Sequence, residues 1–274
     1  MKIFDLHNDF LTKKSKKASL HYINTLATTD IKKIMSVVWS SNLDETKVLD
    51  LLEFISKNGT DKTALAIEDL HFITPLNYPN LLKYNPFYVS LTWNKENNLA
   101  GGVDVLSGLS GFGEKIVQIL QEHNIIIDTA HINERGFLDV AKISTKPIIC
   151  SHTGFYAQEE TCRNLKDYQI KIIEDSGGIV GLYFVSHYLT PRRTANIDDV
   201  IRHIIYFCTH FNINNLALGT DFFGTNHLPQ KLHNYKDISN LTDVLKKKGF
   251  LDTEIEKIIY KNAERFYIAQ RFNM

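Results

Sequence analysis

Short runs of apolar residues recur along the chain, and most of them end in polar residues. Most are rich in β-branched or aromatic side chains, as expected for buried parallel strands that are covered on both faces. The runs are Ile3–Asp9, Ile34–Ser40, Thr63–Asp69, Phe87–Asn94, Ile125–His131, Pro147–Thr153, Gly178–Val185 and Asn215–Asp221. The pattern therefore predicts eight strands.

Segments with apolar residues at helical spacing lie between many of these runs. The segment Ile197–Phe211 follows Asn196, which is a good N-cap residue. The other predicted helices are Glu45–Lys57, Gly113–His123, Leu165–Asp175, Asp237–Lys248 and Asp252–Tyr267. Strands that alternate with helices predict an α/β fold, a closed (β/α)8 TIM barrel. A doubly wound open sheet is the rival, although no Gly-rich phosphate turn follows the first strand.

The length of the chain is compatible with a single barrel domain. It has 274 residues, and such barrels run to about 250 residues as one domain. No linker, low-complexity segment or repeat divides the chain, and the Asn- and Pro-rich stretch Asn77–Pro86 has the length of a loop. We therefore expect residues 1–274 to form one barrel domain.

Composition and charge exclude several classes of protein. Lys plus Arg and Asp plus Glu both number 31, so no basic excess points to nucleic acid. The lysines at 13, 14, 16 and 17 predict a solvated loop. No stretch reaches the about 18 apolar residues of a membrane span, and the first 20 residues lack the apolar core of a signal peptide. Three scattered cysteines favour a reducing compartment. We expect a cytoplasmic protein without membrane or nucleic-acid partners.

Side chains that can bind metal fall at the carboxyl ends of the predicted strands, where barrel enzymes place their chemistry. They are His7, Asp9, Glu68, His131, His152 and Asp221, with Trp93 and Asn94 at the end of the fourth strand. The triplet His7-x-Asp9 puts both side chains on one side of an extended strand.

Each of these residues alone has an ordinary explanation. A Glu at a strand end is more often solvated, a single buried His is more often a hydrogen-bonded core residue, and Asp221 could cap a turn. Their coincidence on one rim favours a metal site. Imidazole nitrogens and carboxylate oxygens suit Zn²⁺, and a carboxylate can bridge two ions.

Several short motifs point to a known family. They are DLHND at 5–9, AIED at 66–69, LTWN at 91–94, IDTAH at 127–131, PIICSHT at 147–153, CRN at 162–164, GTDFFG at 219–224 and KNAERF at 261–266. In this order they span almost the whole chain. The chain resembles the membrane dipeptidase (renal dipeptidase) family of zinc metallopeptidases, as a short bacterial-type member. The resemblance implies an amidohydrolase-like barrel with two Zn²⁺ ions, other divalent metals being an alternative, and a homodimer.

The resemblance implies which residues bind each metal ion. His7 and Asp9 match ligands of one ion, and His131 and His152 match ligands of the second. Glu68 matches the ligand that bridges the two ions.

The resemblance also implies the residues that handle the substrate. Asp221 matches the catalytic acid/base, and Arg163 matches the clamp for the C-terminal carboxylate of the substrate, for which the planar guanidinium is suited. The chain departs from the family at three positions. Trp93 replaces a His that contacts the scissile carbonyl in renal-type members, Phe223 replaces a common Asp, and Asp69 replaces a common Gly.

These matches imply a zinc metallohydrolase that cuts the amide bond of a dipeptide or of a similar small N-acyl amino acid. Two alternatives stay open. One is another barrel metal hydrolase that acts on a lactone or a non-peptide amide, and the other is a non-catalytic binding protein on the same fold. The intact set of ligand residues favours an enzyme, because loss of catalysis tends to show first at the metal ligands.

Overall fold

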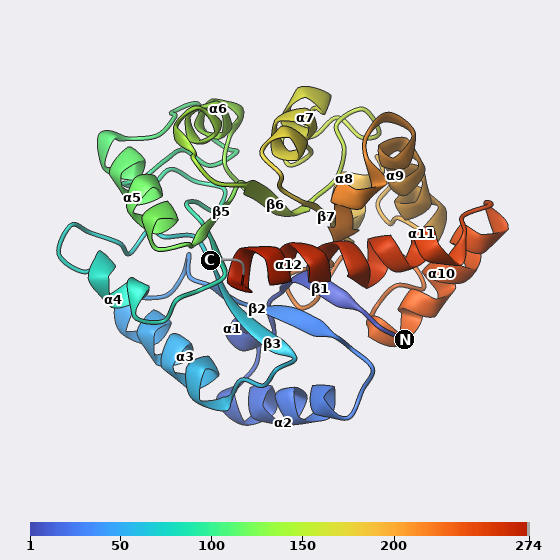
Figure 1. Ribbon diagram of the computed structural model, residues 1–274, viewed down its shortest axis with the longest axis horizontal. Helices are drawn as coiled ribbons and strands as arrows, with labels where there is room; N and C mark the ends of the chain where they lie inside the picture. The colour runs from blue at the N-terminus through green and yellow to red at the C-terminus, as the bar shows by residue number, and fades with distance from the viewer. Residues whose placement is uncertain (273–274) are drawn as a thin grey trace. The chain divides into compact units, whose positions relative to one another are not determined.

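All eight predicted strands are present in the computed structural model, which describes residues 1–272 (Figure 1). They are β1 (Phe4–Asn8), β2 (Lys33–Trp39), β3 (Thr63–Glu68), β4 (Tyr88–Ser90), β5 (Ile126–Asp128), β6 (Ile148–Thr153), β7 (Val180–Leu182) and β8 (Leu216–Leu218). The strands form a closed barrel in the order β1 to β8. This confirms the predicted (β/α)8 fold and excludes the open sheet.

Helices surround the strands. They are α1 (Phe10–Lys13), α2 (Lys16–Ala27), α3 (Glu45–Asn58), α4 (Tyr78–Leu82), α5 (Gly111–Glu122), α6 (Glu134–Ile143), α7 (Asp167–Asp175), α8 (Ser186–Leu189), α9 (Ile197–His210), α10 (Ile238–Lys247), α11 (Asp252–Glu256) and α12 (Asn262–Phe272). A short 3₁₀ turn, η1 (Ile213–Asn215), precedes β8, and another, η2 (Tyr235–Asp237), precedes α10. A π-helical turn, η3 (Lys257–Lys261), joins α11 to α12. None of the helices in residues 1–272 is long and apolar enough to cross a membrane.

The structure corrects several of the predicted boundaries. The lysine-rich segment is not a loop, because Lys13 ends α1 while Lys16 and Lys17 begin α2. Ser15 caps α2 by accepting a hydrogen bond from the N–H of Ala18, which explains why a helix begins there. Helix α6 was not predicted. The stretch at 77–86 contains α4, and the segment predicted as one final helix consists of α11, η3 and α12.

Contacts within the chain divide it into two compact units. Unit 1 consists of Met1–Asn8, Asp30–Ile34 and the chain from Ser151 onward, and unit 2 consists of Asp9–Thr29 and Met35–Cys150. The boundary passes inside β2 and β6, so these two strands contribute residues to both units.

In unit 1, the parallel strands β1, β8 and β7 lie side by side, with Asp5 opposite Leu218 and Leu218 opposite Leu182. Helix α12 contacts β1 and β8, and α9 packs beside α10 (Figure 1). Helix α9 begins with a capping box, in which the side chains of Asn196 and Asp199 each accept a hydrogen bond from the main-chain N–H of the other.

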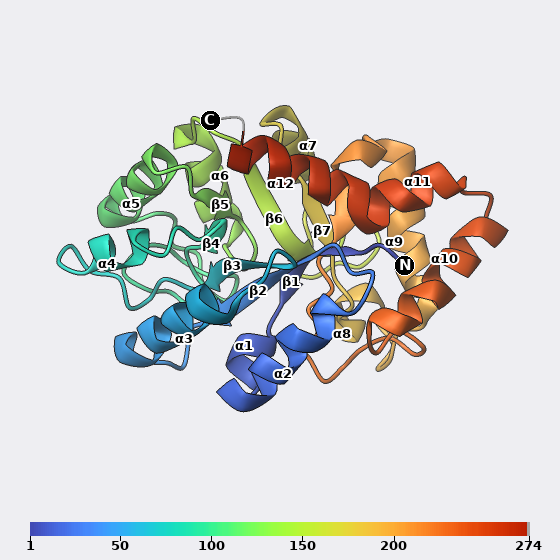
Figure 2. The same ribbon diagram turned by 60° about the horizontal axis from the view of Figure 1, so that its bottom comes forward.

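In unit 2, β3, β4 and β5 are parallel neighbours, with Ala66 opposite Tyr88 and Tyr88 opposite Ile126. Helices α1, α2 and α3 pack against one another, as Figure 2 shows. Helix α5 packs beside α6. Each of the longer helices buries one apolar face, for example Val48, Leu52 and Ile55 of α3.

Candidate metal centre

Two buried imidazole rings lie together in unit 1. His7 on β1 and His152 on β6 are 1% and 2% exposed, and their ring centroids are 3.8 Å apart. The hydroxyl oxygen of Ser151 lies 3.3 Å from Nδ1 of His7 and 2.9 Å from Nδ1 of His152. One hydroxyl therefore orients both rings, as outer hydrogen bonds commonly do for metal-binding histidines.

Asp221 lies beside this pair. A carboxylate oxygen of Asp221 and a ring nitrogen of His7 lie within 4.8 Å of each other, as do ring nitrogens of His7 and His152. Strand β8 ends at Leu218, so Asp221 belongs to the turn after the strand and not to the strand itself. Its φ is 60°, a conformation that Asp tolerates better than most residues, and its N–H donates to the carbonyl of His7 at 3.2 Å.

On β1, two residues before His7, the carboxylate of Asp5 is fully buried. It accepts hydrogen bonds from the main chain of His7 and from Thr220 and Tyr235. Burial raises the pKa of Asp5, while the hydrogen bonds from Thr220 and Tyr235 act in the opposite direction. Sequence analysis did not select Asp5, although an acidic residue inside an apolar strand was a usable signal. Nothing in the sequence singled out Tyr235.

Arg163 also belongs to unit 1 and lies against His152. Its side chain is 5% exposed, and Nη2 donates to the carbonyl of His152 at 3.4 Å. The guanidinium carbon lies 6.0 Å from the ring centroid of Tyr183. Within residues 1–272, the Nε of Arg163 is buried without a hydrogen-bond partner. A buried guanidinium with an unused donor can bind a carboxylate.

Unit 2 brings Glu68 and His131 together. Oε1 of Glu68 lies 2.9 Å from Nε2 of His131, and both side chains are buried. Nδ1 of His131 lies 2.6 Å from Oδ1 of Asn94, so this amide fixes the orientation of the ring. Strand β5 ends at Asp128, and His131 lies in the turn that follows, with a φ of 66°. A carboxylate and an imidazole at this distance are both suitable ligands for a divalent metal.

Asp69, the residue after Glu68, anchors the turn that follows β3. Asp69 has a φ of 71°, which explains why a Gly is suited to the position. Its carboxylate accepts hydrogen bonds from Ser41 at 2.6 Å, from Asn97 at 2.9 Å and from the N–H of His71 at 3.0 Å. Burial raises the pKa of Asp69, against the hydrogen bond from Ser41. These hydrogen bonds hold three loops together and offset the energetic cost of the positive φ of Asp69.

An aromatic pair lies beside His131 in unit 2. The ring centroid of Trp93 is 6.0 Å from that of His131 and 5.3 Å from that of Trp39, which it meets edge-on. The ammonium of Lys13 lies 4.0 Å from the ring centroid of Trp39. Strand β4 ends at Ser90, so Trp93 lies in the loop beyond the strand. Sequence analysis missed Trp39, although a large aromatic residue at the end of a strand was a visible signal.

Asp9 does not continue the first strand as expected. Strand β1 ends at Asn8, and Asp9 is the N-cap residue of α1, with φ −93° and ψ 15°. The argument from alternating side chains in an extended His7-x-Asp9 segment is therefore wrong. The side chain of Asp9 is nevertheless buried.

The remaining histidines have ordinary surroundings where the structure shows them. His203 is fully buried, its Nδ1 accepts from the N–H of Phe155 at 3.1 Å, and burial lowers its pKa to about 4. The ring of His187 lies 5.8 Å from that of His227, and burial lowers the pKa of His187. Cys150 is buried.

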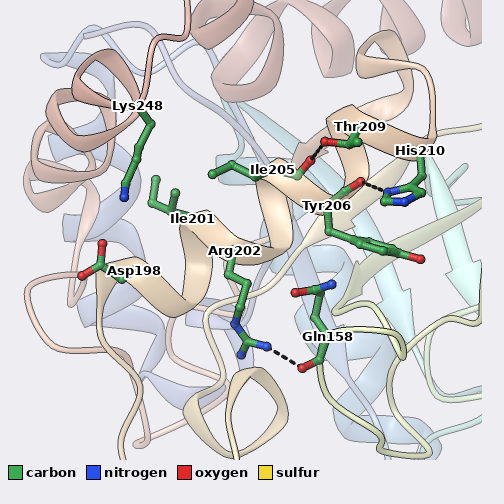
Figure 3. Close-up of a pocket in the computed structure, with 9 residues that line it drawn as sticks. All are labelled: Gln158, Asp198, Ile201, Arg202, Ile205, Tyr206, Thr209, His210 and Lys248. Atoms are coloured by element: carbon green, nitrogen blue, oxygen red, sulfur yellow. Dashed lines mark hydrogen bonds between the residues drawn. The ribbon is translucent and has the colours of Figure 1, made fainter.

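A cavity of about 520 Å³ lies along α9 in unit 1 (Figure 3). Its lining residues are Gln158, Asp198, Ile201, Arg202, Ile205, Tyr206, Thr209, His210 and Lys248. The guanidinium of Arg202 donates to the carbonyls of Gln158 and Leu189, at 2.6 and 2.7 Å, and so serves the local structure. None of the candidate metal or substrate residues lines this cavity.

Buried histidines and carboxylates at or just after the carboxyl ends of the strands of a closed parallel barrel are typical of metal-dependent hydrolases. The chain matches the family described as membrane dipeptidase (peptidase family M19) over residues 25–271. It belongs to this family, and a metal cofactor follows from that membership.

Two curated proteins illustrate the relationship. The chain is 30% identical over 182 residues to a Klebsiella pneumoniae protein described as "Uncharacterized protein in pqqA 5′ region", covering 62% of this chain and 67% of that protein. It is 24% identical over 255 residues to dipeptidase tcpJ of Claviceps purpurea (strain 20.1), covering 88% of this chain and 59% of that protein.

Solved structures show the same fold. A metallopeptidase of family M19 called dipeptidase AC superimposes with a TM-score of 0.87 at 19% identity, covering 98% of each chain. A Rhodobacter sphaeroides metallopeptidase, solved with a phosphinate mimic of the dipeptide L-Ala-D-Ala, superimposes with a TM-score of 0.84 at 17% identity, covering 97% of this chain and 98% of that one.

Proposed function

We propose that this protein hydrolyses the amide bond of dipeptides or of similar small N-acyl amino acids at a metal centre. The proposed ligands are His7, Asp9, Glu68, His131 and His152. The observation that carries the proposal is the buried pair His7 and His152, whose ring nitrogens lie within 4.8 Å of each other, with a carboxylate oxygen of Asp221 also within 4.8 Å of His7. Such a group of donors fits a metal ion by its chemistry.

The topology of the barrel supports the choice of the five proposed ligands. A closed parallel barrel has the carboxyl ends of its strands at one end, and each proposed ligand lies at or just after such an end. Three histidines and two carboxylates suit two Zn²⁺ ions, because one of the carboxylates, that of Glu68, can bridge them. Other divalent metals are an alternative. When bound, the metal supplies a Lewis acid for the amide carbonyl and lowers the pKa of the attacking water.

The residues around the metal have separate proposed roles. Asp221 takes a proton from the attacking water and delivers it to the leaving amide nitrogen, as a general base and then a general acid. Arg163 binds the C-terminal carboxylate of the substrate through its guanidinium. Trp93, with Trp39 against it, packs on the substrate beside His131.

A substrate screen on zinc-loaded protein tests the proposal. The panel contains L,L and L,D dipeptides, L-Ala-D-Ala among them because of the ligand of the Rhodobacter sphaeroides structure, together with N-acyl amino acids and lactones. We expect dipeptides to be turned over fastest. The variant His210→Ala, changed at an exposed residue of α9, is the control that retains activity.

Other results of the screen would contradict the proposal. Turnover of lactones or non-peptide amides without turnover of dipeptides would indicate another barrel metal hydrolase. No turnover by a protein that retains little zinc would indicate a non-catalytic binding protein. A single domain over residues 1–274, a homodimer and a cytoplasmic location stay predictions.

A further inference from the structure

The carboxylate of Asp5 is saturated by donors from three segments of unit 1. Oδ1 accepts from the N–H groups of His7 at 3.2 Å and of Thr220 at 2.8 Å. Oδ2 accepts from the hydroxyls of Thr220 at 2.6 Å and of Tyr235 at 2.5 Å. An ionised carboxylate offers about four acceptor positions, so this fully buried group has a donor for each of them. The network therefore joins β1, the turn after β8, and η2.

The two hydroxyl groups in this network are also acceptors. The hydroxyl of Tyr235 accepts from Nδ2 of Asn8 at 2.8 Å, and the hydroxyl of Thr220 accepts from the N–H of Phe222 at 3.2 Å. Each hydroxyl thus accepts one hydrogen bond and donates another to Asp5. Asn8 follows His7 in the chain and Phe222 follows Asp221, so the network holds the main chain directly next to both site residues.

The turn that carries Asp221 needs such support. Asp221 and Phe223 both have positive φ values, 60° and 71°, and a non-glycine residue persists there only where its surroundings hold it. The N–H of Asp221 donates to the carbonyl of His7 at 3.2 Å, so a shift of either segment moves the other. Tyr235 also packs its ring edge-on against Phe222, with the centroids 5.1 Å apart.

We propose that Tyr235 is a positioning residue. Acting through Asp5, it fastens the long loop after β8 to the end of β1 and sets the positions of His7 and Asp221. The inference rests on the proposed function, since it concerns the residues to which that function assigns metal binding and proton transfer. Tyr235 itself need not touch metal or substrate.

The variant Tyr235→Phe tests the inference, because it removes the hydroxyl and keeps the ring against Phe222. Zinc affinity, measured by competition with a chelator, should fall about 10-fold or more, as for other outer hydrogen-bond partners of metal ligands. The visible absorption of Co²⁺-substituted protein should change, because the geometry around His7 changes. The value of kcat should fall more than KM rises, since the misplaced group is Asp221 and not a substrate-binding residue.

A matched control is available in the same unit. The hydroxyl of Tyr206 donates to the carboxylate of Asp167 at 2.8 Å, on the outer side of α9. Tyr206→Phe therefore also removes a Tyr–Asp hydrogen bond, and it should keep wild-type zinc affinity, cobalt absorption and kcat. A second pair of variants repeats the test at Thr220. Thr220→Val should reproduce the effect of Tyr235→Phe, and Thr220→Ser, which keeps the hydroxyl, should restore wild-type behaviour.

Two outcomes would overturn this inference and leave the proposed function intact. One is a Tyr235→Phe protein with wild-type zinc affinity, cobalt absorption and kcat, and the other is a protein that loses thermal stability but changes none of these three. A wild-type protein that binds neither zinc nor cobalt would instead overturn the proposed function, and the inference with it.

Discussion

The imidazole rings of His7 and His152 pack against each other at 3.8 Å between centroids, although they come from strands far apart in the sequence. Both rings are buried, and the hydroxyl of Ser151 contacts Nδ1 of each. Imidazole nitrogens are common ligands of divalent metal ions, so this close pair of rings makes metal content the first property to measure.

Removing the ring of one proposed histidine ligand should lower the metal content of the protein. Zinc-loaded wild-type protein should hold about two ions per chain, as expected of a two-metal hydrolase, and His152→Ala and His131→Ala should each hold less. Elemental analysis measures the content, with His210→Ala as the control. Because metal that binds only the folded state stabilises it, a chelator should also lower the Tm of the wild type. Wild-type protein that stays metal-free after zinc loading would refute the ligand assignment.

Replacing Asp221 by Asn should separate catalysis from metal binding. The amide has nearly the shape of the carboxylate but cannot accept the proton of the attacking water. Activity should fall by on the order of 10²-fold or more, as for loss of a general acid/base, while fold and zinc content are retained. Steady-state kinetics and elemental analysis on the same sample check both parts. If Asp221→Asn turns over substrate like the wild type, another group transfers the proton.

Arg163 should account for recognition of the free carboxylate of the substrate. Its buried guanidinium lies against the main chain of His152, and its Nε lacks a hydrogen-bond partner within residues 1–272. Amidating the C-terminus of the substrate should weaken kcat/KM about as much as Arg163→Ala does. Combining the two changes should add little, because both remove the same interaction. Losses that add would indicate that Arg163 has a structural role instead.

Buried His203 should make folding stability depend on pH. Its pKa is lowered to about 4 in the folded state, whereas it is about 6.5 in the unfolded chain. Between these values the unfolded state binds more protons, so stability falls as pH falls from about 6.5 toward 4. The shift corresponds to roughly 3 kcal/mol at its full extent.

Urea unfolding at a series of pH values measures this effect. His203→Gln has no titrating ring, so its free energy of unfolding should change less steeply over this range than that of the wild type. His210→Gln replaces an exposed histidine at the end of the same helix and should retain the wild-type slope. Equal slopes for all three proteins would remove His203 as the cause.

Much of the fold could be predicted because its strands are apolar nearly throughout, and this pattern marked all eight of them. The predicted runs were longer than the strands at β4, β5 and β8, because they included residues of the turns that follow the hydrogen-bonded strands. Those turns carry His131 and Asp221, whose positive φ values have no signal in their residue types, since glycine is the usual sign of this conformation.

The candidate site was predictable only in part for a related reason. Residue type and strand-end position were enough to select His7, Glu68 and His152. The supporting contacts of Tyr235 and Trp39 join segments distant in sequence, and no local pattern records such a pairing. Asp69 was visible as a departure from the family, but its hydrogen bonds with Ser41, Asn97 and His71 became apparent only in the structure.

Trp93 should act through its apolar surface. Its indole meets Trp39 edge-on and lies 6.0 Å from the ring of His131, so the two indoles form an aromatic wall next to a proposed metal ligand. An indole has a single N–H donor and no nitrogen that can take up a proton. The pH–rate profile should therefore show no titration from this position, unlike that of a protein with His there.

Kinetics of Trp93→Ala on the best substrate of the screen test this role. If the indole packs on the substrate equally in the ground and transition states, KM should rise more than kcat falls, because uniform binding is lost. Trp93→His should keep the fold and shift substrate preference, since it replaces apolar area by a ring that can accept and donate protons. Trp39→Ala should weaken the same wall and change KM in the same direction as Trp93→Ala. A Trp93→Ala protein that is less stable but has an unchanged KM would assign the indole to packing within unit 2, and the substrate would then contact other groups beside His131.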